Sequence, residues 1–213
     1  MSGSKNTTNV GIRDRTTSGQ PIARRILLAA CLGVVGVASS APTALAHYVH
    51  IPAVPAGLEA PEGNRAYLRY QAYGTQNYIC LAAGQPWTFI GPKAALFNHG
   101  ARQALTHFLS TNPVENGVAR ATWLHSDDSS AVWAQVIASS SDPNFVLPGA
   151  VPWLLLEVVG AQSGPTGGRR ISRTTFIQRV NTVGGMPPLG VCPAAGARAF
   201  VPYETDYVFY RAE

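Results

Sequence analysis

The sequence predicts an all-β, single-domain protein, an antiparallel β-sandwich or barrel-like fold of about ten short strands. Three observations predict this class. Apolar and polar residues alternate over short stretches rich in β-branched and aromatic side chains. Turn-forming Gly, Pro, Asn, Asp and Ser recur at intervals of about 8–12 residues, a spacing typical of sandwiches and barrels. No long apolar stripe with the period of a helix is present.

The first expected strand, residues 65–73, shows the alternation most clearly, and Gly74-Thr75 ends it. One face would carry Ala66, Leu68, Tyr70 and Ala72, and the other Tyr67, Arg69, Gln71 and Tyr73. Further strands are expected at residues 76–81, 87–90, 94–97, 104–109, 118–125, 131–138, 153–159, 174–180, 198–201 and 207–210. Residues 100–109 also fit a short helix, and long loops are expected at 112–117, 160–173 and 184–190.

The N-terminal segment has the order of parts found in export signals. Polar residues 1–25 end in Arg24-Arg25, an apolar run covers 26–38, and Ala44-Leu45-Ala46 offers a small-residue cleavage site. The apolar run is shorter than the roughly 20 residues of a membrane span, which favours a signal over the alternative of a single-pass anchor. The paired arginines fit a twin-arginine signal as well as a general secretory one. We therefore expect an export signal at 1–46, an extended leader at 47–64 and the all-β domain at 65–213, in a secreted, periplasmic or cell-envelope protein.

The formal net charge of +5 lies almost entirely in that signal. Residues 1–46 hold five basic residues and one acidic residue, so the remainder of the chain has a net charge of +1. A basic protein surface would point to nucleic acid or anionic membranes, but after cleavage little excess charge remains. We expect no nucleic-acid partner and no stable membrane span.

Cysteine usage agrees with export. Cys31 lies in the signal, which leaves Cys80 and Cys192 as a pair. Two cysteines in an exported chain most often form a disulfide. Unpaired buried thiols are the alternative if the protein stays in the cytosol. No Cys-x-x-Cys motif supports a redox or cysteine–zinc site.

Several segments together resemble one known family. They include Gly-Thr-Gln-Asn-Tyr-Ile-Cys at 74–80 and Gln-Arg-Val-Asn-Thr-Val-Gly-Gly at 178–185. The others lie at residues 54–58, 87–92, 106–108, 121–126, 152–155 and 201–203. Because these segments follow one another in one order along the chain, the chain resembles DUF3455, a family of uncharacterised exported proteins of bacteria and fungi. The resemblance implies no established activity. Some fungal members carry a malate dehydrogenase label, but no Gly-x-Gly-x-x-Gly follows a strand here.

Motifs for hydrolases, zinc peptidases and phosphate-binding loops are absent from the sequence. A polar site would use residues that recur in the family-like segments: Gln76, Tyr78, His107, His125, Asp128, Arg179 and Asn181. His107 and His125 with a nearby carboxylate and hydroxyl could form a base–nucleophile set. We favour the alternative that both are structural histidines and that 126–130 is a solvated turn.

Cleavage after Ala46 would expose the α-amino group of His47, and His50 follows three residues later. Nitrogen ligands in a planar array suit Cu(II), so these two histidines form a minority copper hypothesis. The alternative is a mobile terminus. Otherwise we expect no cofactor or metal.

Aromatic and basic residues leave two further alternatives. Tyr67, Tyr73, Tyr78 and Trp87 could stack on sugars, whereas Trp123, Trp133 and Trp153 fit a core. Arg169, Arg170 and Arg173 fit a solvated loop better than an anionic-ligand site.

The leading functional hypothesis is a non-catalytic envelope or secreted binding module for a glycan or small molecule. The alternative is an enzyme centred on His107 and His125, or a copper-binding protein using His47.

Overall fold

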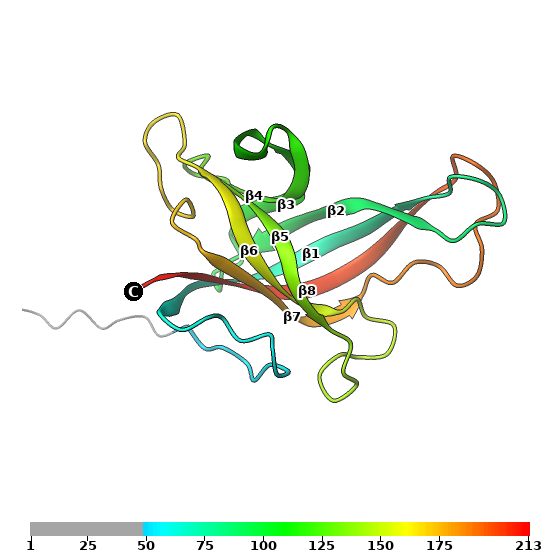
Figure 1. The fold of residues 1–213 in the computed structure, drawn as a ribbon, viewed down its shortest axis with the longest axis horizontal. Coiled ribbons are helices and arrows are strands. Elements are labelled where there is room, and N and C mark those ends of the chain that lie inside the picture. Colours follow the sequence, from blue (N-terminus) through cyan, green and yellow to red (C-terminus); the bar gives the residue numbers. More distant parts are fainter. Residues whose placement is uncertain (1–48) are drawn as a thin grey trace, which may run out of the picture. The chain divides into compact units, whose positions relative to one another are not determined.

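Eight antiparallel strands form one sheet in the computed structural model, which describes residues 49–213. The strands are β1 (Asn64–Ile79), β2 (Thr88–Phe97), β3 (Gln103–Asn112), β4 (Val118–His125), β5 (Ala131–Ser140), β6 (Trp153–Gln162), β7 (Phe176–Gly184) and β8 (Arg198–Ala212). A short 3₁₀ helix, η1 (Pro113–Glu115), connects β3 to β4. Each strand pairs with the next, and β8 pairs with β1, so the sheet closes into a barrel (Figure 1). The all-β antiparallel prediction is confirmed, and the number of strands is eight.

Fewer strands form than expected, because three positions that were expected to end a strand do not end one. Gly74, the Gly91-Pro92 pair and Pro202 each lie inside one continuous strand. A Cβ at Gly74 would lie 2.1 Å from the carbonyl oxygen of Lys93, so the missing side chain lets β2 approach β1. Pro92 and Pro202 lie beyond the last residue pairs with β3 and β7, where no partner needs a proline N–H.

The expected short helix at 100–109 is wrong, because most of it forms strand β3. Its inward-facing residues follow a period of two: Leu105 and His107 are buried inside the barrel, and Thr106 between them is only partly buried. Asn112 is the last residue of β3 and Gly184 the last residue of β7; the rest of 112–117 forms a connection containing η1, and the rest of 184–190 lies in the connection before β8. Residues 160–162 still belong to β6, so the loop expected at 160–173 begins three residues later.

Alternation in β1 holds from residue 68 to residue 73. Leu68, Tyr70 and Ala72 face the interior core. Tyr67 breaks the pattern, because the pairing of β1 with β8 shifts between Ala66 and Leu68. This bulge packs Tyr67 against the interior core and Ala66 against the outer one, opposite to the expected faces.

Two apolar cores stabilise the barrel. The interior core is built around Trp123, Leu96, Ile177 and Phe209. A second core covers the outer face of β6, β7 and β8, where Leu58 from the N-terminal leader and Val146 from the β5–β6 connection pack over Val208. The leader is therefore part of the packed structure.

Figure 1 shows the far ends of β1, β2 and β8 running together beyond the other strands. Beyond them Cys80, directly after β1, and Cys192, before β8, form a disulfide with Cα atoms 5.5 Å apart. The predicted cysteine pairing is confirmed. Among residues 49–213, no helix is long and apolar enough to cross a membrane. The expected export signal and its cleavage site lie outside the described residues.

Candidate functional site

One end of the barrel interior holds a cavity to which every strand contributes. Its volume is about 100 Å³. Its lining is apolar except for a few groups, and consists of Gln76, Phe89, Pro92, His107, Leu109, Ala121, Trp123, Val136, Leu154, Leu156, Arg179 and Tyr207. Eight-stranded barrels have an interior just wide enough to be filled by side chains or to hold one small ligand.

His107 lies in the wall of this cavity, from β3. Its Nδ1 is 2.9 Å from the carbonyl oxygen of Thr122, so Nδ1 carries the proton and donates it, and Nε2 keeps a lone pair. The ring stacks on Trp123 with centroids 4.2 Å apart, and the edge of Tyr207 lies 5.1 Å away. Burial lowers the pKa of His107 to about 3, partly offset by the hydrogen bond to Thr122. The imidazole is therefore neutral and a poor proton acceptor at neutral pH.

Two buried N–H groups in the cavity lining have no acceptor among the described residues. They are the side-chain amide Nε2 of Gln76 and the indole Nε1 of Trp123. A buried donor without a partner costs about 1–3 kcal/mol, so such atoms are uncommon in folded proteins and call for an explanation. Gln76 and Trp123 both line the same small cavity, whereas the third such donor among the described residues, the indole Nε1 of Trp153, belongs to the outer core.

Arg179 brings a positive charge to the same cavity from β7. Its Nε and Nη2 donate to the carbonyl oxygen of Pro152 at 3.2 and 2.7 Å. No carboxylate lines the cavity, and none of the ion pairs formed within residues 49–213 includes Arg179. The cavity therefore combines one guanidinium and two free donors with no negative group.

Tyr78 lies two residues beyond Gln76 on β1 and does not line the cavity. Its hydroxyl donates to the carbonyl oxygen of Gly185 at 2.7 Å, and burial raises the pKa of the phenol. Tyr78 joins β1 to the β7–β8 connection, which is a structural role.

His125 and Asp128 lie apart from the cavity. His125 on β4 is paired with Leu105 on β3, two residues along each strand from the pair formed by His107 and Trp123. The backbone N–H of Asp127 donates to its Nδ1 at 3.2 Å, which leaves no proton there for the Asp128 carboxylate, 3.3 Å away. Burial lowers the pKa of His125, with the nearby Asp128 acting in the opposite direction.

The Asp128 carboxylate holds a neighbouring loop. One oxygen accepts from the backbone and hydroxyl of Ser130 at 3.1 and 2.8 Å, and the other accepts from the backbone N–H of Arg170 at 2.9 Å. Burial alone would raise the pKa of Asp128, but these hydrogen bonds outweigh it and lower the pKa. The two histidines and this carboxylate therefore do not form one site.

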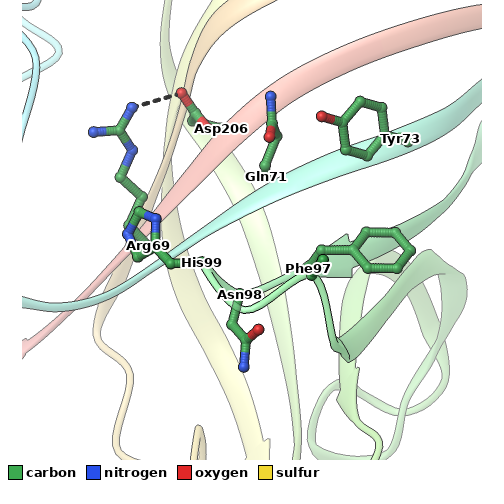
Figure 2. A pocket seen from close by; sticks show the side chains of 8 residues that line it. Arg69, Gln71, Tyr73, Phe97, Asn98, His99 and Asp206 are labelled. Carbon is green, nitrogen blue, oxygen red and sulfur yellow. Dashed lines mark hydrogen bonds and ion pairs between the residues drawn. The ribbon is translucent and has the colours of Figure 1, made fainter.

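Asn181 lies in a second place, on the outside of the barrel. It occupies a left-handed conformation (φ 53°) where the pairing of β7 with β8 shifts, and its amide donates to Asp206 at 2.8 Å. Asp206 also accepts from Arg69 at 2.8 Å, as drawn in Figure 2. Arg69 and Asp206, but not Asn181, line an open hollow of about 690 Å³, together with Gln71, Tyr73, Phe97, Asn98, His99 and Ala101.

The copper hypothesis stays a prediction. His47 lies outside the described residues, and His50 is exposed, with Arg69 Nη1 3.0 Å from its carbonyl oxygen. Within residues 49–213, no group of three or more His, Cys, Asp and Glu side chains is placed to hold a metal ion.

The structure therefore brings Gln76, His107 and Arg179 together and separates the other four candidates. It adds two residues that sequence reasoning did not select, Trp123 and Tyr207. Trp123 had been expected only as core. The available signal was strand alternation: Trp123 lies directly opposite His107 in the β3–β4 pairing, and paired residues share a face.

Comparisons with known proteins leave the chain among relatives without an assigned role. No curated protein and no solved structure matches it significantly. The model of one family matches residues 61–211, which covers the whole barrel from just before β1 into the end of β8. The resemblance found in the sequence is thereby confirmed, and the chain belongs to the DUF3455 family, described as proteins of unknown function.

Proposed function

We propose that this protein is an exported binding module whose barrel cavity takes a small organic carboxylate or a similar oxygen anion. The carrying observation is the set of two unpartnered N–H donors and one guanidinium around a cavity without a carboxylate. Hydrogen bonds between charged partners are about twice as strong as neutral ones, so a carboxylate would gain most from this lining.

The remaining lining supports an apolar ligand body. Phe89, Leu109 and Val136 line the cavity and are exposed by 48, 39 and 52%. The interior volume is close to that of three water molecules in the liquid, so only the polar head and a few carbon atoms fit inside. The rest of the ligand would contact this apolar rim, as in most small-molecule sites.

The state of His107 supports binding over catalysis. A general base needs a pKa near the working pH, whereas burial keeps the pKa of His107 at about 3. No carboxylate lines the cavity to assist His107, and Asp128 instead holds a loop elsewhere. His107 would instead support the indole of Trp123 by stacking.

The test is calorimetric titration with a panel of small aromatic and short aliphatic carboxylates, each paired with its neutral primary amide. We expect carboxylates to bind and their amides to bind at least tenfold more weakly. Arg179→Gln and Trp123→Phe should each weaken the carboxylate by about tenfold or more, as expected for a lost charge-assisted hydrogen bond. Arg198→Gln, which removes an exposed arginine at the start of β8, is the matched control.

A folded Arg179→Gln variant that binds the same carboxylate with unchanged affinity would refute the proposed role of this cavity. So would a panel in which no carboxylate binds the folded wild-type protein. Mass spectrometry of the secreted fraction tests the export half of the proposal separately, through the mature N-terminus expected at His47.

A second candidate ligand is a saccharide, favoured by the outer hollow in Figure 2. Tyr73 and Phe97 form an edge-on aromatic pair with centroids 6.0 Å apart, and Gln71 and Asn98 add hydrogen-bonding amides to the same hollow. Aromatic faces beside polar side chains suit sugar rings. Titration with oligosaccharides tests it: binding that Tyr73→Ala removes would support this candidate, and absence of binding would exclude it for the sugars used.

A further inference from the structure

Four arginines line a separate hollow at the barrel end where β1 begins and β8 ends. The hollow has a volume of about 370 Å³ and contains no acidic residue in its lining. It is lined by Tyr67, Leu68, Tyr70, Arg169, Arg170, Arg173 and Arg211. Tyr70 and Gln76, which lines the barrel cavity, are six positions apart on β1, which corresponds to roughly 20 Å of strand, so the two sites are distinct.

None of these four guanidinium groups forms an ion pair within the described part of the chain. The arginines with ion-pair partners there are Arg69, Arg102 and Arg120, none of which lines this hollow. Two carboxylates on the adjoining β4–β5 turn have other partners: Asp127 pairs with Arg102, and Asp128 accepts from Ser130 and from the backbone N–H of Arg170.

Strand pairing adds a fifth positive charge. Arg65 on β1 lies directly opposite Arg211 on β8. Like charges at directly opposed positions destabilise a sheet. Five of the eleven basic residues in 47–213 are therefore gathered at one end of a chain segment whose net charge is only +1. The overall charge conceals this local concentration.

The loop that carries three of these arginines is fixed in place. The Asp128 carboxylate holds the backbone of Arg170 at 2.9 Å, and the hydroxyl of Ser130 accepts from the N–H of Ile171 at 3.2 Å. Ile171 is fully buried in the interior core. A Cβ at Gly168 would lie 2.4 Å from Cβ of Asp128, so the loop fits closely against the β4–β5 turn.

The fourth arginine is held from the strand side. The guanidinium of Arg211 lies 4.9 Å from the ring centroid of Tyr67, in a cation–π contact. The Tyr67 hydroxyl is 2.7 Å from the hydroxyl of Thr174, in the connection between the arginine loop and β7. The loop backbone and Arg211 are thus held in place, while the side chains of Arg169, Arg170 and Arg173 are exposed. A fixed backbone reduces the conformational entropy lost when an anion binds.

We propose that this arginine hollow binds a phosphate or sulfate ester group of a ligand. Guanidinium groups present planar pairs of donors that match the oxygens of such groups, and several of them converge here. The aromatic rings of Tyr67 and Tyr70 would contact the apolar part of an ester. This site is independent of the barrel cavity and of the carboxylate proposed for it.

The experiment is calorimetric titration of the wild-type protein with phenyl phosphate and with phenyl sulfate. It is done at low ionic strength, because salt screens exposed charges. We expect at least one ester to bind, and the triple variant Arg169→Gln/Arg170→Gln/Arg173→Gln to weaken it more than tenfold. Arg211→Gln serves as a milder variant, with unfolding curves to verify that each variant is folded. Arg198→Gln is the matched control and should bind like the wild type.

The two esters distinguish the source of the anion: tighter binding of phenyl phosphate indicates a phosphoryl ligand and tighter binding of phenyl sulfate a sulfated one. Failure of both esters to bind overturns the proposal, and so does binding unchanged in the folded triple variant. Arg179→Gln distinguishes the two sites: ester binding lost in Arg179→Gln but kept in the triple variant would place the ester in the barrel cavity and overturn this proposal, whereas the reverse pattern assigns it to the arginine hollow.

Discussion

The stability of this barrel should fall in mild acid because it buries a neutral histidine. His107 is 3% exposed, and burial lowers its pKa from 6.5 to about 3. In the unfolded chain the imidazole is free to take up a proton near its ordinary pKa. The unfolded state therefore binds more protons than the folded state between about pH 6.5 and 3, and stability is lost as the pH falls through this window.

The size of the effect follows from the two pKa values. Each pH unit inside the window costs up to about 1.4 kcal/mol, and lowering the pH from 7 to 4.5 costs about 2.5 kcal/mol from His107 alone. His125 acts in the same direction, since burial also lowers its pKa. A variant that removes only His107 isolates its share.

The assay is urea unfolding of wild-type protein and His107→Gln at pH values from 7 to 4.5. Glutamine does not titrate and keeps an N–H able to reach the carbonyl oxygen of Thr122. The free-energy difference between the two proteins should shrink by about 2.5 kcal/mol over this range. His99→Gln, at an exposed histidine, should leave the curve parallel to the wild type. Parallel curves for wild type and His107→Gln would refute the reasoning.

Three further changes test the scaffold. Replacing Cys80 and Cys192 by alanine should lower the free energy of unfolding by up to about 5 kcal/mol, measured by denaturant titration, because their bond spans 112 residues of sequence. Gly74→Ala should cost about 1–3 kcal/mol or more, since its Cβ would collide with the backbone of β2, whereas Gly100→Ala at an exposed turn should be nearly neutral. Ile171→Ala should cost about 2–5 kcal/mol and increase proteolysis of the arginine loop, because that side chain is fully buried; unchanged thermal stability would contradict it.

Local patterns predicted the strands where the chain alternates and misjudged where strands end. Gly74 and Pro202 normally interrupt a strand, and here they do not, for reasons found in neighbouring strands. Gly74 allows β2 to approach, and Pro202 lies beyond the last residue pair with β7. Whether a glycine or proline breaks a strand depends on what lies beside it, which a single segment of sequence does not contain.

The candidate polar residues also show what a local sequence pattern predicts and what the pairing of strands decides. Gln76, His107 and Arg179 were selected from separate segments, and the closed sheet brings them to one cavity. Asn181 comes two residues after Arg179 but faces outward, because the pairing of β7 with β8 shifts at this point. Residue type predicted which side chains are polar and reactive, and the register of the strands determined which of them meet.

By itself the sequence determined an all-β antiparallel fold, the pairing of Cys80 with Cys192 and membership of the DUF3455 family. These properties follow from local alternation, from a count of two cysteines and from short ordered segments. Only the tertiary structure decided that eight strands close on themselves, that one cavity gathers two donors without an acceptor, and that four arginines line one hollow at the other end, with Arg65 paired opposite one of them. Closure and convergence depend on pairing between residues far apart in the chain, and that pairing is a property of the folded sheet as a whole.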